Sequence, residues 1–532
     1  MTTEPFDISS WPPSLTPIQL EALTLYATTY ALSHGLLYLL PGPQPAIPSA
    51  AIHAPFSLFP SPFPRKLFET GKRIQRTYNV LYARIAMDEE FLDRVMGTKT
   101  GVGKVDDFIG QLWTGWKQLR DEGLAQHLHL GLFRSDYLLH ALSNQPLSIK
   151  QVEFNTISVS FACLSQRISE LHRYLLSSTQ YYNCSPQLKP ENLPPNRTIS
   201  GLAEGLAVGH KAYNVQGSRI LFVVQPGERN VFDQRWLEYE LLEQHSILII
   251  RQTFEELAHS AIVDPHTYIL RVSCSTDIHP SGSIEISTVY YRAGYMPNEY
   301  PTPAHYATRF LLERSKAIKC PTIALQLAGG KKVQEVLAQP GVLERFLRDE
   351  KRYGKDGIFS EHEVNELRST FMAMWGLDVG EDLLTADYDS ISSGKEGFGL
   401  LKARNDAHAL VLKPQREGGG NNVYKEAIPA FLNSLPPQER QAWIAMELII
   451  PPEGTGNYLI RAGTIQAESQ AAVKADVVSE LGIFGYALFG GESREVKEKE
   501  VGWLVRTKGK DSDEGGVATG FSVLDSLLLV DS

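Results

Sequence analysis

The spacing of hydrophobic residues changes along the chain, from a helical repeat to short strand-like runs. Residues 1–40 and 65–126 read as helical, and the proline-dense stretch between them must be extended or irregular. From Arg219 onward, apolar runs such as RILFVVQP and SILIIRQT alternate with helical stretches. This alternation is typical of βαβ units, so it predicts an α/β fold with a predominantly parallel sheet.

Predicted strands dominate the last third of the chain. A helical stretch over about 327–374 precedes apolar runs that include HALVLKP and VGWLVRT. Two polar, glycine-rich segments, SSGKEGFGLLKARNDAH and KGKDSDEGG, interrupt these strands, and we expect both to be loops. The first makes 393–408 an enlarged loop to which the sequence assigns no role.

Composition and charge exclude several classes of protein. The 532 residues suffice for two or three domains, and 43% are hydrophobic and 21% charged. The net charge of −10, without a lysine- or arginine-rich run, argues against a nucleic-acid partner or an anionic membrane surface. Four cysteines lie far apart without a CxxC pair, which favours a reducing compartment over a zinc site or a disulfide framework.

The N-terminal region has two features that bear on targeting. Its first residues contain acids and prolines and no basic segment, so we expect no signal peptide. Residues 22–40 carry no formal charge, which approaches the length of a membrane span. Threonine, serine, histidine and glycine interrupt this stretch, so a buried or interface helix is favoured over a membrane span.

The segment KPQREGGGNN, residues 413–422, follows an apolar strand and contains three consecutive glycines. Consecutive glycine N–H groups can form an anion-binding concavity, and Lys413 could reach the same phosphates. Glu417 could hold a magnesium ion that bridges them. A flexible surface loop is the competing interpretation, because neither a Gly-Lys-Ser/Thr word nor an obvious helix follows.

The predicted strand QVEFNTISVS places polar residues on one face. Alternation directs Glu153 and Asn155 to one side, and Val152 and Phe154 into a core. A carboxylate and an amide oxygen two residues apart suit a hard cation, although an exposed edge strand would show the same pattern. The serines that follow could donate hydrogen bonds to a ligand beside that metal.

Three further segments place polar groups after predicted strands. GWLVRTKGKDSDEGG contains Arg506 and Lys508 beside a glycine pair and suits a phosphate or carboxylate lid, or a solvated turn. RAGYMP and QPGERNVFDQR lie where α/β sheets usually bind ligands, although each could be a capped helix start. The sequence contains no GxSxG or HExxH word, which makes hydrolase and zinc-enzyme functions poor candidates.

Taken together, these segments resemble eukaryotic-type glutathione synthetase, a family of the ATP-grasp ligase superfamily. The matching words run in the family's order from about residue 54 to the C-terminus. They are FRSDY, EFNTISVS, ERNVFDQR, YYRAGYMP, IKCPTIALQLAGGKKVQ, LKPQREGGGNN, SELGIFG, LVRTK and GGVATG.

The resemblance implies a nucleotide and metal site. It implies Mg²⁺, two ions per site, bound by Glu153, Asn155 and Glu417, with Arg506 and Lys413 as catalytic cations. The residues implied for ATP binding are Glu153, Lys331, Lys413, Pro414, Gln415, Arg416, Glu417, Gly418, Gly419, Gly420, Asn421, Asn422, Tyr424, Met446, Glu447, Leu448, Ile449, Glu480, Lys508 and Glu514.

The resemblance also implies the substrates γ-glutamylcysteine and glycine. The cysteinyl carboxylate of the dipeptide would attack the γ-phosphate of ATP, and the amine of glycine would then attack the acyl phosphate. The residues implied for substrate binding are Arg134, Ile157, Ser158, Val159, Ser160, Glu228, Arg229, Asn230, Gln234, Arg292, Ala293, Gly294, Tyr295, Arg506, Val517 and Ala518.

The implied architecture is a discontinuous, permuted ATP-grasp core, a parallel-sheet α/β substrate domain and a glycine-rich lid. We place the boundaries at 1–218 for the N-terminal helical part and first half of the core, 219–325 for the substrate domain, and 326–532 for the rest of the core with the lid. The resemblance further implies a cytoplasmic homodimer, with the apolar N-terminal helix buried in the monomer or between subunits.

Two departures from the family's words leave alternatives open. Ala293 stands where the family usually has aspartate in an RDGY word, and the loop before Val517 is unusually acidic. Ala518 and Thr519 replace the alanine pair that goes with glycine as acceptor, so β-alanine is an alternative acceptor. An ATP-binding protein without catalysis is the remaining alternative, which the joint presence of the acidic and basic site residues disfavours.

Overall fold

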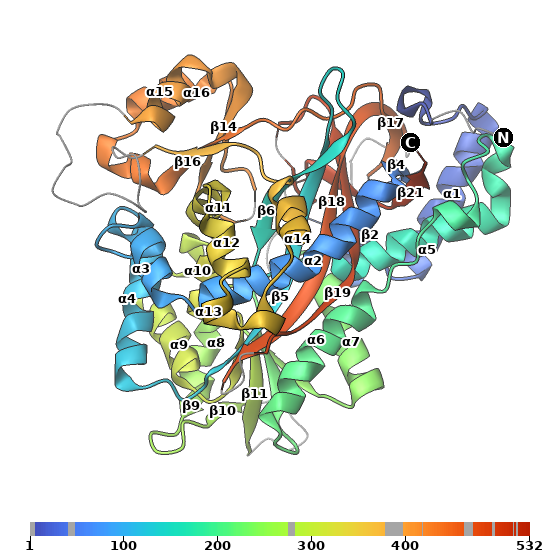
Figure 1. The fold of residues 1–532 in the computed structure, drawn as a ribbon. Coiled ribbons are helices and arrows are strands. Elements are labelled where there is room, and N and C mark those ends of the chain that lie inside the picture. Colours follow the sequence, from blue (N-terminus) through green and yellow to red (C-terminus); the bar gives the residue numbers. More distant parts are fainter. Residues whose placement is uncertain are drawn as a thin grey trace.

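The computed structural model describes residues 6–40, 48–274, 282–377, 397–417, 419–461, 472–491, 495–513, 515–517 and 520–531. Within them the fold is mixed α/β and is organised around one sheet of 13 strands (Figure 1). These strands are β3 (Phe56–Ser57), β5 (Leu128–His140), β6 (Ser148–Asn155), β7 (Arg219–Val223), β8 (Ile249–Gln252), β9 (Ala261–Val263), β10 (Leu270–Ser273), β11 (Ser283–Tyr291), β12 (Ile318–Cys320), β17 (Gly456–Ile460), β18 (Val473–Gly490), β19 (Lys497–Gly509) and β20 (Ser522–Asp525).

Helices cover the sheet on both faces. The described helices are α1 (Pro17–Ser33), α2 (Arg65–Ala86), α3 (Glu89–Met96), α4 (Asp107–Glu122), α5 (Ala162–Thr179), α6 (Thr198–Tyr213), α7 (Val231–His245), α8 (Phe254–Ser260), α9 (Pro303–Arg314), α10 (Ile323–Ala328), α11 (Lys331–Ala338), α12 (Val342–Leu347), α13 (Glu350–Tyr353), α14 (Glu361–Arg368), α15 (Phe398–Asn405) and α16 (Ala427–Ser434). Figure 1 shows α2 crossing the long strands β18 and β19, with α5 and α6 packed beside them.

Alternation along β18 separates two hydrophobic cores. Leu481 and Ile483 pack in one core with the buried face of α2, whereas Phe484 and Tyr486 pack in a second core with α5 and α6. Successive strand residues point to opposite faces, so a central strand can supply both cores at once. The sheet is therefore the middle layer of three.

Strand β5 changes character along one of its faces. Leu130 and Leu132 lie in the core shared with α5 and α6, and the next residues on that face are Arg134, Asp136 and Leu138. Tyr137 on the opposite face stays in the core beneath α2. One face of β5 thus leaves the hydrophobic core and becomes polar, which places charged side chains on a rigid strand.

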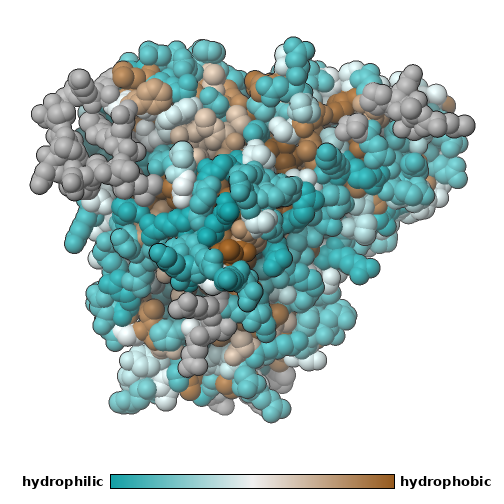
Figure 2. Space-filling model, viewed as in Figure 1, coloured by the Kyte–Doolittle hydropathy of each residue, from teal (hydrophilic) through white to brown (hydrophobic). Residues whose placement is uncertain are grey.

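Three smaller sheets complete the described fold. They pair β1 (Leu37–Leu39) with β2 (Ala51–His53), β4 (Ser61–Pro64) with β21 (Leu527–Val530), and order β13 (Met374–Gly376), β16 (Trp443–Glu447), β14 (Leu410–Pro414) and β15 (Val423–Tyr424). The last of these forms a lobe with α15 and α16 at the upper left of Figure 1. The face of the molecule seen in Figure 2 is mainly hydrophilic, with hydrophobic residues in small groups.

The structure agrees with most of the expected elements and corrects three. Strands β7, β8, β11 and β12 are parallel as predicted, but β9 and β10 are antiparallel, and so are the pairs β5–β18, β18–β19 and β19–β20 of the same sheet. The helical interpretation of 1–40 holds for α1 and is wrong at Leu37–Leu39, which pairs as a strand. The first residues of the expected loop over 393–408 lie outside the described part of the chain, and the rest contains α15, because Leu400 and Ala403 bury their side chains in the small lobe.

The uncharged N-terminal stretch buries one side of α1. Leu23, Ala27 and Ala31 are fully buried, because a spacing of four residues keeps side chains on one side of a helix. In the portion of the chain that the structure describes, no helix combines the length and apolarity needed to cross a membrane. The domain boundaries proposed from the sequence stay a prediction.

Candidate active site

A cavity of about 530 Å³ opens where β5, β6, β18 and β19 meet the β14–β15 hairpin. That volume lies within the range of small-ligand sites. The predicted site residues that line it are Arg134, Glu153, Asn155, Ile157, Ser158, Val159, Ser160, Tyr295, Lys413, Glu417, Gly419, Asn422, Tyr424, Met446, Glu447, Leu448, Ile449, Glu480, Arg506, Lys508 and Val517. Segments far apart in the sequence therefore converge on one pocket.

A β-bulge shapes the wall formed by β6. Glu153 pairs with Asp136 and Gln151 with Tyr137, which leaves Val152 as the extra residue. Phe154 is in the core as predicted, but the prediction that Val152 points into the core is wrong, because Val152 lines the cavity. The bulge frees the Val152 carbonyl, which accepts a hydrogen bond of 2.8 Å from Nζ of Lys413.

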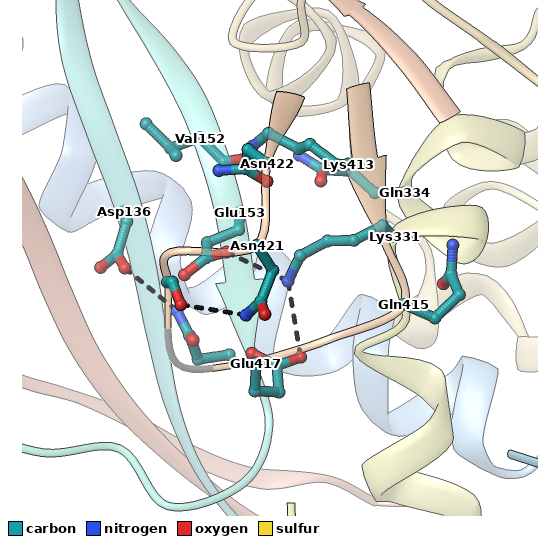
Figure 3. Close-up of polar contacts among 12 residues, drawn as sticks. Asp136, Val152, Glu153, Lys331, Gln334, Lys413, Gln415, Glu417, Asn421 and Asn422 are labelled. Carbon is teal, nitrogen blue, oxygen red and sulfur yellow. Dashed lines mark hydrogen bonds and ion pairs between the residues drawn. The ribbon is translucent and has the colours of Figure 1, made fainter. Parts of the chain in front are cut away.

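Lys331 lies between two carboxylates, an arrangement that we call the Lys331 group (Figure 3). Its Nζ is 3.0 Å from Oε2 of Glu153 and 3.4 Å from Oε1 of Glu417. Burial opposes the charge of this lysine, but the two carboxylates outweigh it and raise the pKa of Lys331. Lys331 lies at the start of α11, so the group joins a helix, a strand and the glycine-rich loop.

The two carboxylates of the Lys331 group differ in their electrostatics. Burial would raise the pKa of Glu153, but Lys331 and Lys413 outweigh burial and hold that pKa well below its usual range. Burial raises the pKa of Glu417, which has fewer cations near it. Two carboxylates that already share a lysine cation can share a metal ion instead, and the Asn155 amide lines the same pocket. These residues therefore fit the predicted magnesium site.

Asp136 lies between two arginines on the adjoining part of the sheet, an arrangement that we call the Asp136 group. Nε and Nη2 of Arg134 donate to its two oxygens at 2.6 and 2.8 Å, and Nη2 of Arg506 donates at 3.1 Å. Arg506 also pairs with Glu480 across the β18–β19 ladder. Although burial opposes it, Glu480 and Asp136 raise the pKa of Arg506. Asp136 was absent from the predicted site.

Arg292 holds the turn that follows β6. Its Nη1 donates to the backbone oxygens of Ser158 and Val159, both at 2.6 Å. Ser158 has a φ of 53°, a left-handed conformation that a serine adopts at some cost. Arg292 is therefore a buried residue that supports the cavity wall. Although it was predicted to bind substrate, it does not itself line the cavity.

Glu299 organises the loop of the RAGY word. Its carboxylate accepts hydrogen bonds from the N–H groups of Gly294, Tyr295 and Met296 at 2.9–3.0 Å. Gln225 donates to the same carboxylate at 2.8 Å and to the Tyr295 hydroxyl at 3.0 Å. A carboxylate therefore shapes this loop even though position 293 is alanine. Glu299 lies six residues after that alanine and was not among the predicted site residues.

Several predicted residues lie outside the cavity lining. Arg416 pairs with Asp106 at the start of α4, and Gln415 accepts from the N–H of Lys332. Glu228 accepts from the N–H of Asn230 and from Gln234. The others that do not line the cavity are Lys331, Pro414, Gly420, Asn421, Arg229, Ala293 and Gly294. Gly418, Glu514 and Ala518 lie outside the described residues.

The cavity also has lining residues that the sequence did not single out. Leu138, Val411 and Val478 add apolar surface near the Met446 strand, which suits a planar base. Lys425 forms an ion pair of 3.1 Å with Asp513, so the hairpin and the acidic loop meet at the mouth. The sequence did not single these residues out, because they reach the cavity through the tertiary packing of distant segments.

Comparisons with known proteins agree on one family. The sequence profile described as "Eukaryotic glutathione synthase, ATP binding domain" matches residues 17–529. The chain is 37% identical to glutathione synthetase of Homo sapiens over 509 residues, 96% of each chain. It is 36% identical to glutathione synthetase large chain of Schizosaccharomyces pombe, over 97% of this chain and 98% of that protein.

A solved structure has the same fold. It is a glutathione synthetase-like effector of Globodera pallida in its apo form, with a TM-score of 0.70 and 23% sequence identity. The similarity covers 97% of this chain and 98% of that one.

Proposed function

This chain belongs to the eukaryotic glutathione synthase family, and we propose that it joins γ-glutamylcysteine and glycine to form glutathione, ADP and phosphate. The observation that carries the proposal is which residues line the cavity. Metal-type oxygens of Glu153, Asn155 and Glu417 line the same pocket as the cations Lys413 and Arg506. Transfer of a phosphoryl group to a carboxylate needs both kinds of group.

The first chemical step brings two anions together. The cysteinyl carboxylate of the dipeptide attacks the γ-phosphorus of ATP, and ADP leaves. Lys413 and Arg506 offset the negative charge that spreads over the transferred group, in a site where burial strengthens each interaction. The acyl phosphate then loses phosphate when the amine of glycine attacks its carbonyl carbon.

Magnesium would be held by Glu153, Asn155 and Glu417. When bound, Mg²⁺ neutralises phosphate charge and orients the nucleotide. Because Lys331 contacts both carboxylates, it keeps them close together at the cavity without a metal. We infer two ions per site from the family resemblance.

The architecture that we propose is an ATP-grasp core with a covering lid. The β14–β15 hairpin and the loop through Asp513 meet at the cavity mouth, which supports a role in excluding water from the acyl phosphate. The boundaries 1–218, 219–325 and 326–532 remain our proposal for its domains. The wide spacing of the four cysteines along the sequence supports a reducing, cytoplasmic location.

We propose a homodimer that uses the outer face of α1. Ile18, Leu25 and Leu32 recur every seven residues and are 80%, 63% and 47% exposed. A second copy of the chain would cover this apolar face. Leu25→Glu should then lower the mass measured by light scattering from that of a dimer to that of a monomer, and an unchanged mass would remove α1 from the interface.

A coupled assay of ADP release tests the function. Without another nucleophile, we expect sustained ADP release only when γ-glutamylcysteine and glycine are both present, and mass spectrometry should identify glutathione. Hydroxylamine in place of glycine should trap the acyl phosphate as a hydroxamate. Faster turnover with β-alanine than with glycine would change the acceptor, and ATP binding without ADP release would favour a catalytically silent protein.

A further inference from the structure

Asp136 contacts three residues of the candidate site without lining the cavity. Its side chain has no exposed surface. It accepts two hydrogen bonds from Arg134, one from Arg506 and one of 3.1 Å from Nδ2 of Asn155. Each of these three partners does line the cavity. One buried carboxylate therefore connects groups that we assign to substrate, catalysis and metal.

We propose that Asp136 is a positioning residue that orients Asn155, Arg134 and Arg506 toward the reacting groups. This inference rests on the proposed function and assigns a role to a residue outside the predicted site. The three partners come from β5, β6 and β19, so the carboxylate ties three strands together at the cavity.

Asp136 fixes the orientation of the Asn155 side chain, whose amide group could otherwise point either its nitrogen or its oxygen toward the cavity. Nδ2 donates to the backbone oxygen of Arg134 at 3.3 Å and to Oδ2 of Asp136 at 3.1 Å. Both partners are acceptors only, so the nitrogen must lie on their side. The amide oxygen is then left on the other side of the group, as a ligand for a hard cation. Asp136 thereby decides which atom of Asn155 can bind metal.

The two arginines depend on the same carboxylate. Arg134 and Arg506 are like charges that both approach Oδ2 of Asp136, and without the carboxylate their guanidinium groups would repel each other. The paired contact with Nε and Nη2 of Arg134 also fixes the plane of that guanidinium. Nη1 of Arg134 reaches the backbone oxygen of Ser160 at 3.4 Å, at the edge of the cavity wall.

The neighbouring strand leaves room for this ion pair. Gly482 on β18 lies opposite Asp136 in the ladder. A Cβ atom at this glycine would lie 2.9 Å from Oδ1 of Asp136 and 3.0 Å from Cδ of Arg134, closer than side chains pack. Glycine at position 482, the first glycine of the SELGIFG word, is therefore explained by the close approach of the Asp136 and Arg134 side chains.

Asp136→Asn alone does not separate positioning from simple charge, because loss of a negative charge also weakens cation binding through its field. Positioning therefore requires that the loss depend on Asn155 and recur in Asp136→Glu, which keeps the charge. If Asp136 positions its neighbours, its amide nitrogen meets the donors of Arg134, and the Asn155 amide turns its nitrogen toward the metal. Cation binding should then weaken. Asp525→Asn is the matched control, because Asp525 is an equally buried carboxylate that contacts Ser61 and Thr507, neither of which lines the cavity.

The experiment measures Mn²⁺ affinity in the ADP complex of the full-length protein, from the electron paramagnetic resonance signal of free Mn²⁺. We expect Asp136→Asn to weaken Mn²⁺ binding about 10- to 100-fold, as for other residues that orient metal ligands. Asp525→Asn should stay within about twofold of wild type. Wild-type or tighter Mn²⁺ binding by Asp136→Asn, or equal losses in both variants, would overturn the proposal.

Two further variants complete the test. In an Asn155→Ala background, Asp136→Asn should add less than about a threefold loss of Mn²⁺ affinity, because the ligand through which it acts is gone. If Asp136→Asn does not fold, Asp136→Glu keeps the charge but displaces it, and the same loss is expected. Wild-type protein that forms no glutathione would refute the proposed function, whereas an active wild type with an unaffected Asp136→Asn variant would refute this inference alone.

Discussion

The Lys331 group and the Asp136 group are inverse arrangements on neighbouring parts of the cavity wall. In the first, one lysine contacts two carboxylates, whereas in the second, one carboxylate contacts two arginines. A metal ion can take over the role of the lysine, because both carboxylates line the cavity. Nothing from solution can replace Asp136, which has no exposed surface. The carboxylates of the Lys331 group can therefore exchange their lysine contact for a metal ion, whereas the arginines of the Asp136 group keep the same carboxylate.

The largest effect is expected for Glu417→Gln. The substitution keeps the size of the side chain but leaves Lys331 with Glu153 alone and removes one oxygen charge from the proposed metal site. We expect kcat to fall by on the order of 10³-fold, with a melting temperature close to that of wild type. Glu366→Gln, which removes a carboxylate paired with Arg73, is the control and should remain active. Near-normal ADP release by Glu417→Gln would remove the metal role of Glu417.

A smaller effect is expected for Arg506→Lys, which tests the Asp136 group. Lysine keeps the charge, but its single nitrogen lacks the planar, spread donors with which a guanidinium can contact Asp136, Glu480 and the cavity at once. We expect kcat to fall by about 10²-fold, with a smaller change in the KM for ATP. Arg73→Lys is the matched control. A kcat within threefold of wild type would show that charge alone is needed at position 506.

The two groups also differ in how far the sequence predicts them. Glu153 and Asn155 follow from strand alternation, and Glu417 from the glycine-rich segment beside it, so the carboxylates of the Lys331 group were expected. Asp136 was not, because its importance arises from the pairing of β5 with β6 and with β18. Strand pairing joins residues hundreds of positions apart, and no local pattern records it.

The same limit explains the corrections to the fold and the site. The inward orientation assigned to Val152 assumed a regular strand, and the bulge follows from the ladder with β5. The expected role of Arg416 at the phosphates stays a prediction, and the structure adds a partner that the motif did not indicate, Asp106, which lies 310 residues earlier. Helix and strand types were predictable from periodicity, whereas bulges and ion pairs depend on the tertiary neighbours.

The smallest effect concerns Asp525, a third buried carboxylate, which has hydroxyl rather than cationic partners. Burial raises the pKa of Asp525 from 3.8 to about 6, and the hydrogen bonds from Ser61 and Thr507 only partly oppose this. The folded state therefore binds more protons than the unfolded state between about pH 4 and pH 6, and stability from this group is lost as pH rises through that window. The loss amounts to about 3 kcal/mol at most.

Asp525→Asn should remove this component while leaving activity intact. The melting temperature of wild type minus that of the variant should fall between pH 4.5 and pH 7, because only the wild type has the titrating group. Working with the difference cancels carboxylates such as Glu153, whose lowered pKa gives the opposite trend. A difference that stays constant over this range would mean that Asp525 is ionised throughout. Hydrogen bonds from hydroxyl groups would then suffice to keep a buried carboxylate in its ionised form.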